Sequence, residues 1–323
     1  MKVRLPATCL LLLCFVSGAA VCAPAQPVET HSPVIYSTDL YYTFLMDNDD
    51  PFDAAVLLKC PDLNVHGVIL DNHTFPSDGE KVLEKIMELS GHRVPYVKGL
   101  GEFAMRSFDD PGLDAADQGG VDMILHTLRQ SKEKVTLIGV GSMTDFAVAY
   151  VREPQLFHQN VAKIYVVAGT MESRVQDWNV KLDPIAFVKL MRSDLPIVWV
   201  PVDTSMWYFP APQMLVPEKN QLAHFLLNES LYYYLNLDAK GSLHKDRYEY
   251  YDLGLRLWST PAFVLAANDP HASEMFDTAP AKVEFDNDGM INSVKFVPES
   301  NILVVKRVNG VKLNQYIVRQ INR

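Results

Sequence analysis

Five aspartates lie close together near the start of the chain, within STDLYYTFLMDNDDPFDAA, residues 37–55. The run VIYST at the front of this segment is typical of a strand, and the run AAVLL at its end is typical of a helix. Clustered carboxylates repel one another, so some of them must bind protons unless a cation lies between them. Ca²⁺ takes about six to eight oxygen ligands from such groups. The pattern therefore indicates either a cation site or a solvated acidic loop that caps the helix.

The surrounding sequence alternates between short β-branched runs and helical patterns. Strand-like VHGVILD and VTLIGVG alternate with helix-like SDGEKVLEKIMELSG and MTDFAVAYVRE. This alternation predicts an α/β fold, with a mostly parallel sheet and helices on both faces. In open sheets of this kind, ligands bind beyond the carboxyl ends of the strands. One rim of the sheet is therefore expected to carry Asp39, Asp71, Gly141, Gly169 and Asp203.

The pattern changes in the last third of the chain. Residues 210–252 are predicted to be helical and are rich in tyrosine. Over residues 281–323, alternating apolar residues and the turn sequences Asn-Asp-Gly and Asn-Gly predict a small antiparallel, β-rich addition. With 48% hydrophobic residues, the chain can bury a large core, and we expect one domain over residues 33–323.

Residues 1–23 have the features of a secretory signal peptide. Lys2 and Arg4 precede an apolar run, and small residues end the segment. The run is too short for a membrane span, which takes roughly 20 apolar residues. We therefore expect a secreted, extracellular protein without a membrane span. Asn72 (in NHT) and Asn228 (in NES) would be its glycosylation acceptors.

Charge and cysteine content narrow the class further. Removal of the signal takes away two basic residues and no acidic one, so the formal net charge moves from −10 to −12. Recognition of a phosphate backbone needs a basic face, so nucleic acid is not an expected partner. Cys60 is the one cysteine outside residues 1–23, so no disulfide within the mature chain is expected.

Several motifs occur in the order found in the nucleoside hydrolases of the inosine–uridine-preferring type. That family opens with DTDxGxDDAxAL, and STDLYYTFLMDNDDPFDAAVLL looks like a lengthened form of it. TLIGVGSMTDFAVAY resembles the family's GPLTNIALAL, and QDWNVKLDPIAFVKLM resembles its EFNxxxDPEAA. The resemblance covers residues 33–269 and matches less clearly after that.

The resemblance implies hydrolysis of the N-glycosidic bond of ribonucleosides. In the family, Ca²⁺ holds two ribose hydroxyls and a water, and an aspartate takes the proton of that water. A metal lowers the pKa of bound water, and carboxylates stabilise the positive charge that develops on the sugar. Position by position, Asp39 is then the catalytic base and a metal ligand. The other implied metal ligands are Asp50, the main-chain carbonyl of Val140, and Thr260; the implied substrate-binding residues are Asp49, Asp71, Asp177 and Asn179.

Two alignments of the first motif are open. Counting back from the helix makes Asp49 and Asp50 the paired aspartates, with an insertion after Asp39. Matching without a gap uses Asp47, Asp49 and Asp53 instead, and puts an alanine at a metal carboxylate. We prefer the first alignment, because STD ends the strand as DTD should.

Three departures bear on activity. Ser37 replaces the first aspartate of DTD, and LDNHTF replaces AGN, so Asp71 is a candidate to face the site. The family's late HDP becomes STP, with Ser259 at the histidine and Thr260 at the aspartate. Thr260 offers only a neutral oxygen, so weaker Ca²⁺ binding is expected. Ser259 cannot donate a proton near neutral pH as a histidine can.

Two functions therefore stay open. One is a secreted nucleoside hydrolase that uses Ca²⁺ and acts on small-molecule ribonucleosides. The other is a catalytically impaired or inactive homologue, secreted as a Ca²⁺-binding or ribosyl-ligand-binding protein or as part of the extracellular matrix. The late STP favours the second, whereas Asp39, Asp49, Asp50 and Asn179 favour the first. A homo-oligomer is an open alternative to a monomer.

Overall fold

The computed structural model describes residues 32–40, 49–72, 79–101, 104–109, 118–172, 175–205, 207–210, 214–215, 219–228 and 255–323. All of them belong to one compact unit, His31–Arg323. The predicted signal peptide and most of the predicted helical segment 210–252 lie outside the described residues, although residues 221–228 are helical. No helix of the described part is long and apolar enough to cross a bilayer.

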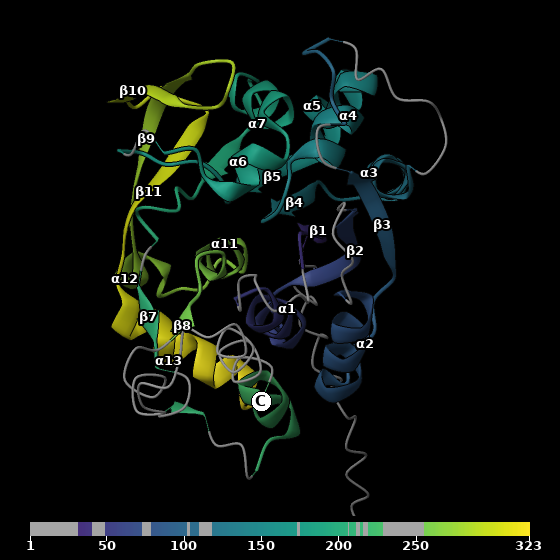
Figure 1. Cartoon of the computed structure of the whole chain (residues 1–323), viewed down its shortest axis with the longest axis vertical. Coiled ribbons are helices and arrows are strands. Elements are labelled where there is room, and N and C mark those ends of the chain that lie inside the picture. Colours follow the sequence, from purple (N-terminus) through teal and green to yellow (C-terminus); the bar gives the residue numbers. More distant parts are fainter. Residues whose placement is uncertain are drawn as a thin grey trace, which may run out of the picture. The chain divides into compact units, whose positions relative to one another are not determined.

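A nine-stranded sheet forms the centre of the molecule (Figure 1). Its order is β10-β9-β11-β6-β5-β4-β1-β2-β3, and β7 and β8 form a separate antiparallel pair. The strands are β1 (Pro33–Thr38), β2 (Asn64–Asn72), β3 (Tyr96–Gly101), β4 (Val135–Gly139), β5 (Val161–Val166), β6 (Ile197–Trp199), β7 (Tyr208–Phe209), β8 (Leu255–Arg256), β9 (Phe276–Phe285), β10 (Ile291–Phe296) and β11 (Ile302–Val308).

The first six strands pair in parallel, which confirms the predicted α/β class. At the other edge, β9 pairs antiparallel with both β10 and β11, while β11 joins the sheet parallel to β6. The predicted antiparallel addition is thus continuous with the main sheet. Central strand β1 is buried along its whole length: Tyr36 faces one core and Ile35 the other, and both are fully buried.

Helices cover both faces of the sheet (Figure 1). One core packs under α1, α2, α11 and α13, and the other under α3, α4, α5 and α7. The helices are α1 (Asp49–Lys59), α2 (Gly79–Ser90), α3 (Gly119–Gln130), α4 (Thr144–Arg152), α5 (Pro154–Asn160), α6 (Trp178–Leu182), α7 (Pro184–Met191), α11 (Thr260–Ala266), α12 (Ala272–Met275) and α13 (Gly310–Ile321).

The prediction of strands through the C-terminus is wrong after Val308. Asn309 and Gly310 do not make a hairpin turn, because Asn309 caps helix α13 by accepting a hydrogen bond from the amide of Lys312 at 3.4 Å. The residues of α13 that are buried are Leu313, Asn314, Tyr316, Ile317, Gln320 and Ile321. Their spacing follows the helical period of about 3.6 residues, which the alternation of apolar residues had concealed.

The direction of the crossovers reverses between β1 and β4. From β1 the chain continues to β2 and β3 on one side, and β4, β5 and β6 lie on the other. The two strand ends are joined, since the amide of Val140 donates to the carbonyl of Ser37 at 2.9 Å. In open α/β sheets such a reversal opens a crevice beyond the carboxyl ends of the strands, where ligands bind. Asp39 follows β1 and Val140 follows β4, so both stand at this crevice.

Candidate metal and active site

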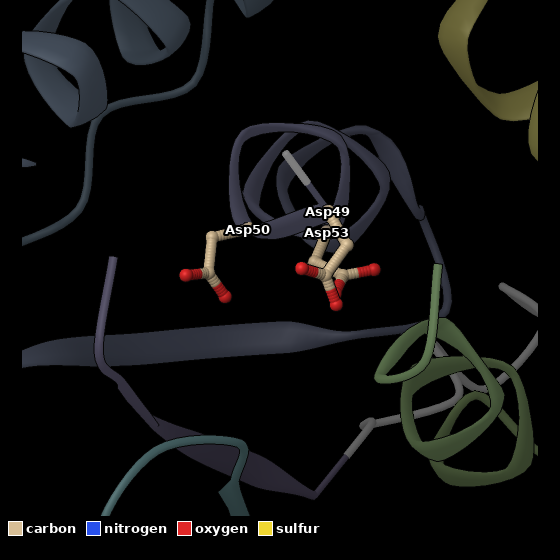
Figure 2. Close-up of side chains that lie close together, drawn as sticks. All are labelled: Asp49, Asp50 and Asp53. Atoms are coloured by element: carbon tan, nitrogen blue, oxygen red, sulfur yellow. The ribbon is translucent and has the colours of Figure 1, made fainter. Parts of the chain in front are cut away.

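Three aspartates of the first turns of α1 form an acidic cluster. Asp49, Asp50 and Asp53 are all buried, and each offers a carboxylate oxygen that lies within 4.8 Å of those of the others. Asp50 and Asp53 are three residues apart and therefore share a helix face. Figure 2 shows all three carboxylates extending to the same side of the helix. Hard cations such as Ca²⁺ prefer such a set of oxygen atoms, so the cluster fits a divalent ion.

Asp53 is the deepest member of the cluster. Its Oδ1 accepts a short hydrogen bond from the hydroxyl of Thr260, the first residue of α11. Within the described part of the chain its Oδ2 has no hydrogen-bond partner. Burial raises the pKa of Asp53 well above its ordinary value, and the neighbouring Asp50 raises it further. In the sequence, Asp53 is a candidate only in the gapless alignment, whose other new member, Asp47, lies outside the described residues.

The end of β1 gathers the other predicted acids. Asp39 is buried, and the loop after β4 lies against it: a Cβ placed on Gly141 would be 2.6 Å from the Asp39 amide nitrogen and 2.5 Å from Asp71 Oδ2. Asp71 accepts hydrogen bonds from the Ser37 hydroxyl at 3.2 Å and the Ser142 amide at 2.6 Å. Burial raises the pKa of Asp71 well above its ordinary value. Asp71 therefore ties β1 to the loop that carries Val140.

Gly141 should tolerate no side chain. Gly141→Ala is expected to lower the free energy of unfolding by about 1–3 kcal/mol, because the added Cβ meets backbone and a buried carboxylate that cannot move away. Gly101→Ala is a matched control, since its Cβ would meet no atom of the described residues closer than 3.2 Å. Urea unfolding of both variants measures the difference. Equal destabilisation of the two variants would contradict this account of the crevice floor.

Thr38 links the two groups of acids. It stands between Ser37 and Asp39, and its hydroxyl donates to Asp50 Oδ1 at 3.4 Å and accepts from the Leu40 amide at 3.1 Å. The acidic cluster of α1 and the acids at the end of β1 consequently face one site. In the described part of the chain α1 opens with Asp49 and Asp50, the pair that our preferred alignment uses, and the choice between the two alignments stays a prediction.

The predicted ribose-binding residues meet the predicted main-chain ligand. The side-chain amide of Asn179 donates to the carbonyl oxygens of Val140 at 2.6 Å and Val167 at 2.9 Å. A carbonyl oxygen has two lone pairs, so Val140 keeps one for a cation. Both amide hydrogens of Asn179 are used, which leaves its Oδ1 to contact a ligand.

Asp177 has a clear structural role beside them. Its Oδ2 accepts from the amides of Gly169 at 2.6 Å and Val180 at 3.2 Å, so it caps helix α6. Burial raises the pKa of Asp177 above its ordinary value. This carboxylate holds the segment that carries Asn179 in place, whatever else it contacts.

The late STP segment enters the site from α11. Ser259 is buried and stands directly before the helix, without a side-chain hydrogen bond to the helix amides. The next residue, Thr260, reaches the acidic cluster as described. A separate open hollow of about 510 Å³ lies beside β7, α12 and α13 and contains none of these residues. The candidate active site is therefore the region of the acidic cluster, and the hollow is not part of it.

The chain is similar to a known family and to several known proteins. The model of a family described as "Inosine-uridine preferring nucleoside hydrolase" matches residues 38–315. A pyrimidine-specific ribonucleoside hydrolase, RihA of Klebsiella pneumoniae subsp. pneumoniae, is 24% identical over 181 residues, which cover 49% of this chain and 58% of that protein. RihA of Escherichia coli O1:K1 is 25% identical over 181 residues, which again cover 49% of this chain and 58% of that protein. The chain thus spans 58% of the length of these curated relatives.

Solved structures extend the likeness of fold over most of the chain. An inosine-guanosine nucleoside hydrolase superposes with a TM-score of 0.67 at 16% identity, covering 90% of this chain and 99% of that one. A purine-preferring ribonucleoside hydrolase from Gardnerella vaginalis gives a TM-score of 0.66 at 17% identity, covering 90% and 98%. At these identities the likeness establishes the fold, and the site must decide the chemistry.

Proposed function

Because this chain belongs to the inosine-uridine preferring nucleoside hydrolase family, we propose that it hydrolyses the N-glycosidic bond of ribonucleosides with a water activated at a Ca²⁺ ion. One observation carries the proposal. Asp39 ends β1 at the reversal of the sheet, and Thr38 beside it contacts Asp50 of the acidic cluster. Together with the contact between Asn179 and Val140, these contacts support one site with a base, a set of oxygen ligands and a hydrogen-bonding amide.

The residues divide the work between them. A Ca²⁺ ion held by Asp39, Asp50 and the Val140 carbonyl would polarise a water and two ribose hydroxyls. Asp39 takes a proton from the water while the water oxygen bonds to the anomeric carbon. The bond between that carbon and the nucleobase nitrogen breaks. Asp49 and Asn179 orient the ribose. The carboxylates around the sugar stabilise the positive charge that develops on it.

The nucleobase that leaves has no strong proton donor at the position of Ser259. Ser259 stands where the family has a histidine, and a hydroxyl is a far weaker acid near neutral pH than an imidazolium. We expect slow release of purine and pyrimidine bases, and faster hydrolysis of a p-nitrophenyl riboside, whose leaving group needs no protonation. The assay compares both substrates with Ca²⁺ and with chelator. Hydrolysis of neither substrate, at any Ca²⁺ concentration, would rule out the proposed activity.

The second candidate, a secreted protein that binds Ca²⁺ or a ribosyl ligand without turnover, is favoured by Ser259. The same assay separates the two, because a binder would bind Ca²⁺ or ribose in calorimetry and release no base. Ser259→His should then raise hydrolysis of nucleosides more than hydrolysis of the nitrophenyl riboside. An equal rise for both substrates would show that the position does not protonate the leaving group.

We also propose that the protein is secreted. The signal-like residues 1–23 support this, and the two acceptor asparagines, Asn72 and Asn228, are both exposed. A small-molecule ribonucleoside is the proposed partner. Expression in a secreting host, followed by N-terminal sequencing and glycosidase treatment of the product, tests the signal and the two acceptors together.

A further inference from the structure

The contact between Thr260 and Asp53 joins two departures from the family's sequence. Thr260 stands where the family has an aspartate that binds Ca²⁺, so one negative charge is missing from α11. Asp53 lies one turn inside α1, where neither aspartate of the preferred alignment falls. The Thr260 hydroxyl donates directly to Asp53 Oδ1, so the two side chains meet at one point of the site. A charge absent from one helix is therefore present on the other.

The free oxygen of Asp53 is available at this point. Asp53 is fully buried, its Oδ1 is bound by Thr260, and its Oδ2 has no hydrogen-bond partner among the described residues. A buried carboxylate oxygen without a partner is unfavourable unless a proton or a cation satisfies it. One carboxylate oxygen of Asp53 lies within 4.8 Å of carboxylate oxygens of Asp49 and Asp50.

A second buried polar group lies against the cluster. The side chain of Tyr36 is fully buried in β1, and its hydroxyl lies near the Thr38 hydroxyl without a hydrogen bond of good geometry among the described residues. Its ring packs edge-on against Phe263, one turn after Thr260, with centroids 5.3 Å apart. Burial raises the pKa of Tyr36 well above its ordinary value, and the carboxylates of Asp50 and Asp53 raise it further, so the phenol lies within their reach. A bound ion is one explanation for a buried polar atom without a partner, and the free oxygen of Asp53 fits that explanation.

We propose that Asp53 is a carboxylate ligand of the divalent cation, held by the Thr260 hydroxyl, and that it carries the charge that the family places on α11. The inference rests on the proposed cation site and adds a ligand to it. It replaces the expectation that Thr260 itself lies in the shell. Because the charge has moved and has not been lost, Ca²⁺ binding is not weakened by the threonine.

Calorimetric titration of the full mature protein with CaCl₂ tests the assignment. Asp53→Asn keeps the shape and the acceptor for Thr260 but removes the charge, and should weaken Ca²⁺ binding by about tenfold or more. Thr260→Val removes the hydroxyl alone and should weaken binding by about 10–100-fold, as loss of a group that orients a ligand does. Asp122→Asn, an exposed aspartate in the first turn of α3, is the control and should bind like the unmodified protein.

A double variant that moves the negative charge back to α11 gives the most specific test. Asp53→Asn combined with Thr260→Asp returns the carboxylate to α11, and should recover most of the affinity lost in Asp53→Asn. Unchanged affinity in Asp53→Asn and in Thr260→Val, or no recovery in the folded double variant, would overturn the inference. Circular dichroism confirms that each variant is folded. If the unmodified protein binds Ca²⁺ and hydrolyses its substrate while both single variants bind equally well, only this inference fails; if it binds no divalent ion, the proposed Ca²⁺ chemistry fails with it.

Discussion

Asp39→Asn is expected to lower the rate of riboside hydrolysis by about 10²–10⁴-fold, the usual contribution of a general base. An asparagine has nearly the same shape as an aspartate but cannot accept the proton of the attacking water. Asp39 is buried at the end of a central strand, where the main chain is fixed by its neighbours on both sides. The fold should therefore survive the change. The measurement is kcat at saturating Ca²⁺. Asp39 is also a proposed metal ligand, so its substitution will weaken the binding of Ca²⁺.

Asp62→Asn is the control for this experiment. Asp62 follows α1 at the end opposite to the acidic cluster, so its substitution should leave kcat unchanged. If folded Asp39→Asn protein kept its rate with Ca²⁺ at saturation, the base would have to be another carboxylate of the crevice. A loss that excess Ca²⁺ fully restored would reduce Asp39 to a metal ligand.

The position of the site could be predicted from the sequence because it follows from topology. Alternating strand and helix patterns imply a parallel sheet, and a parallel sheet places the residues that follow its strands on one rim. Asp39, Asp71 and Gly141 meet there as expected, although they are far apart in the chain. Nothing beyond the periodicity of the strands and the order of the motifs was needed for that step.

Contacts that depend on the packing of two helices could not be predicted in the same way. Asp53 and Thr260 are separated by 207 positions, and only the packing of α11 against α1 brings them together. In the sequence, Asp53 was one more acid in an acidic segment. The helix α13 was missed for a different reason: Asn-Gly begins a hairpin turn in many strands, and here Asn309 caps a helix instead. The Asn-Gly sequence is compatible with a hairpin turn, but burial of the apolar face of α13 stabilises the helix instead.

Asp145 carries the last prediction, which concerns stability. It lies in the first turn of α4, where the resembling family motif has asparagine, and it is buried. Its Oδ2 accepts from the Leu100 amide at 3.0 Å, while its Oδ1 has no partner among the described residues. A Cβ on Gly99 or on Gly120 would come within 2.5 Å or 2.2 Å of its carboxylate oxygens, so bare backbone packs around it.

Burial raises the pKa of Asp145 from 3.8 to about 6. A group whose pKa is raised by folding favours the native state while it is protonated. Its contribution is complete below about pH 4 and is lost as the pH rises through about 6. Above that range the ionised Asp145 costs about 3 kcal/mol relative to the protonated form, since one pKa unit corresponds to about 1.4 kcal/mol. We therefore expect this residue to destabilise the protein at neutral pH.

Asp145→Asn is expected to raise the free energy of unfolding by about 1–3 kcal/mol at pH 7–8, and by close to nothing at pH 4. The amide fills the same space, accepts from Leu100, and carries no charge at any pH. It also removes a carboxylate that raises the pKa of Asp71. Urea unfolding of both proteins between pH 4 and pH 8, without divalent ions, measures the difference, and Asp122→Asn on the exposed side of α3 is the control. Because the other buried acids titrate in both proteins, the gap between the two curves reports the charge of Asp145 together with its effect on Asp71. A gap that does not grow between pH 4 and pH 7 would show that Asp145 is ionised in the native protein at little cost, and that solvent or an unseen partner reaches its second oxygen.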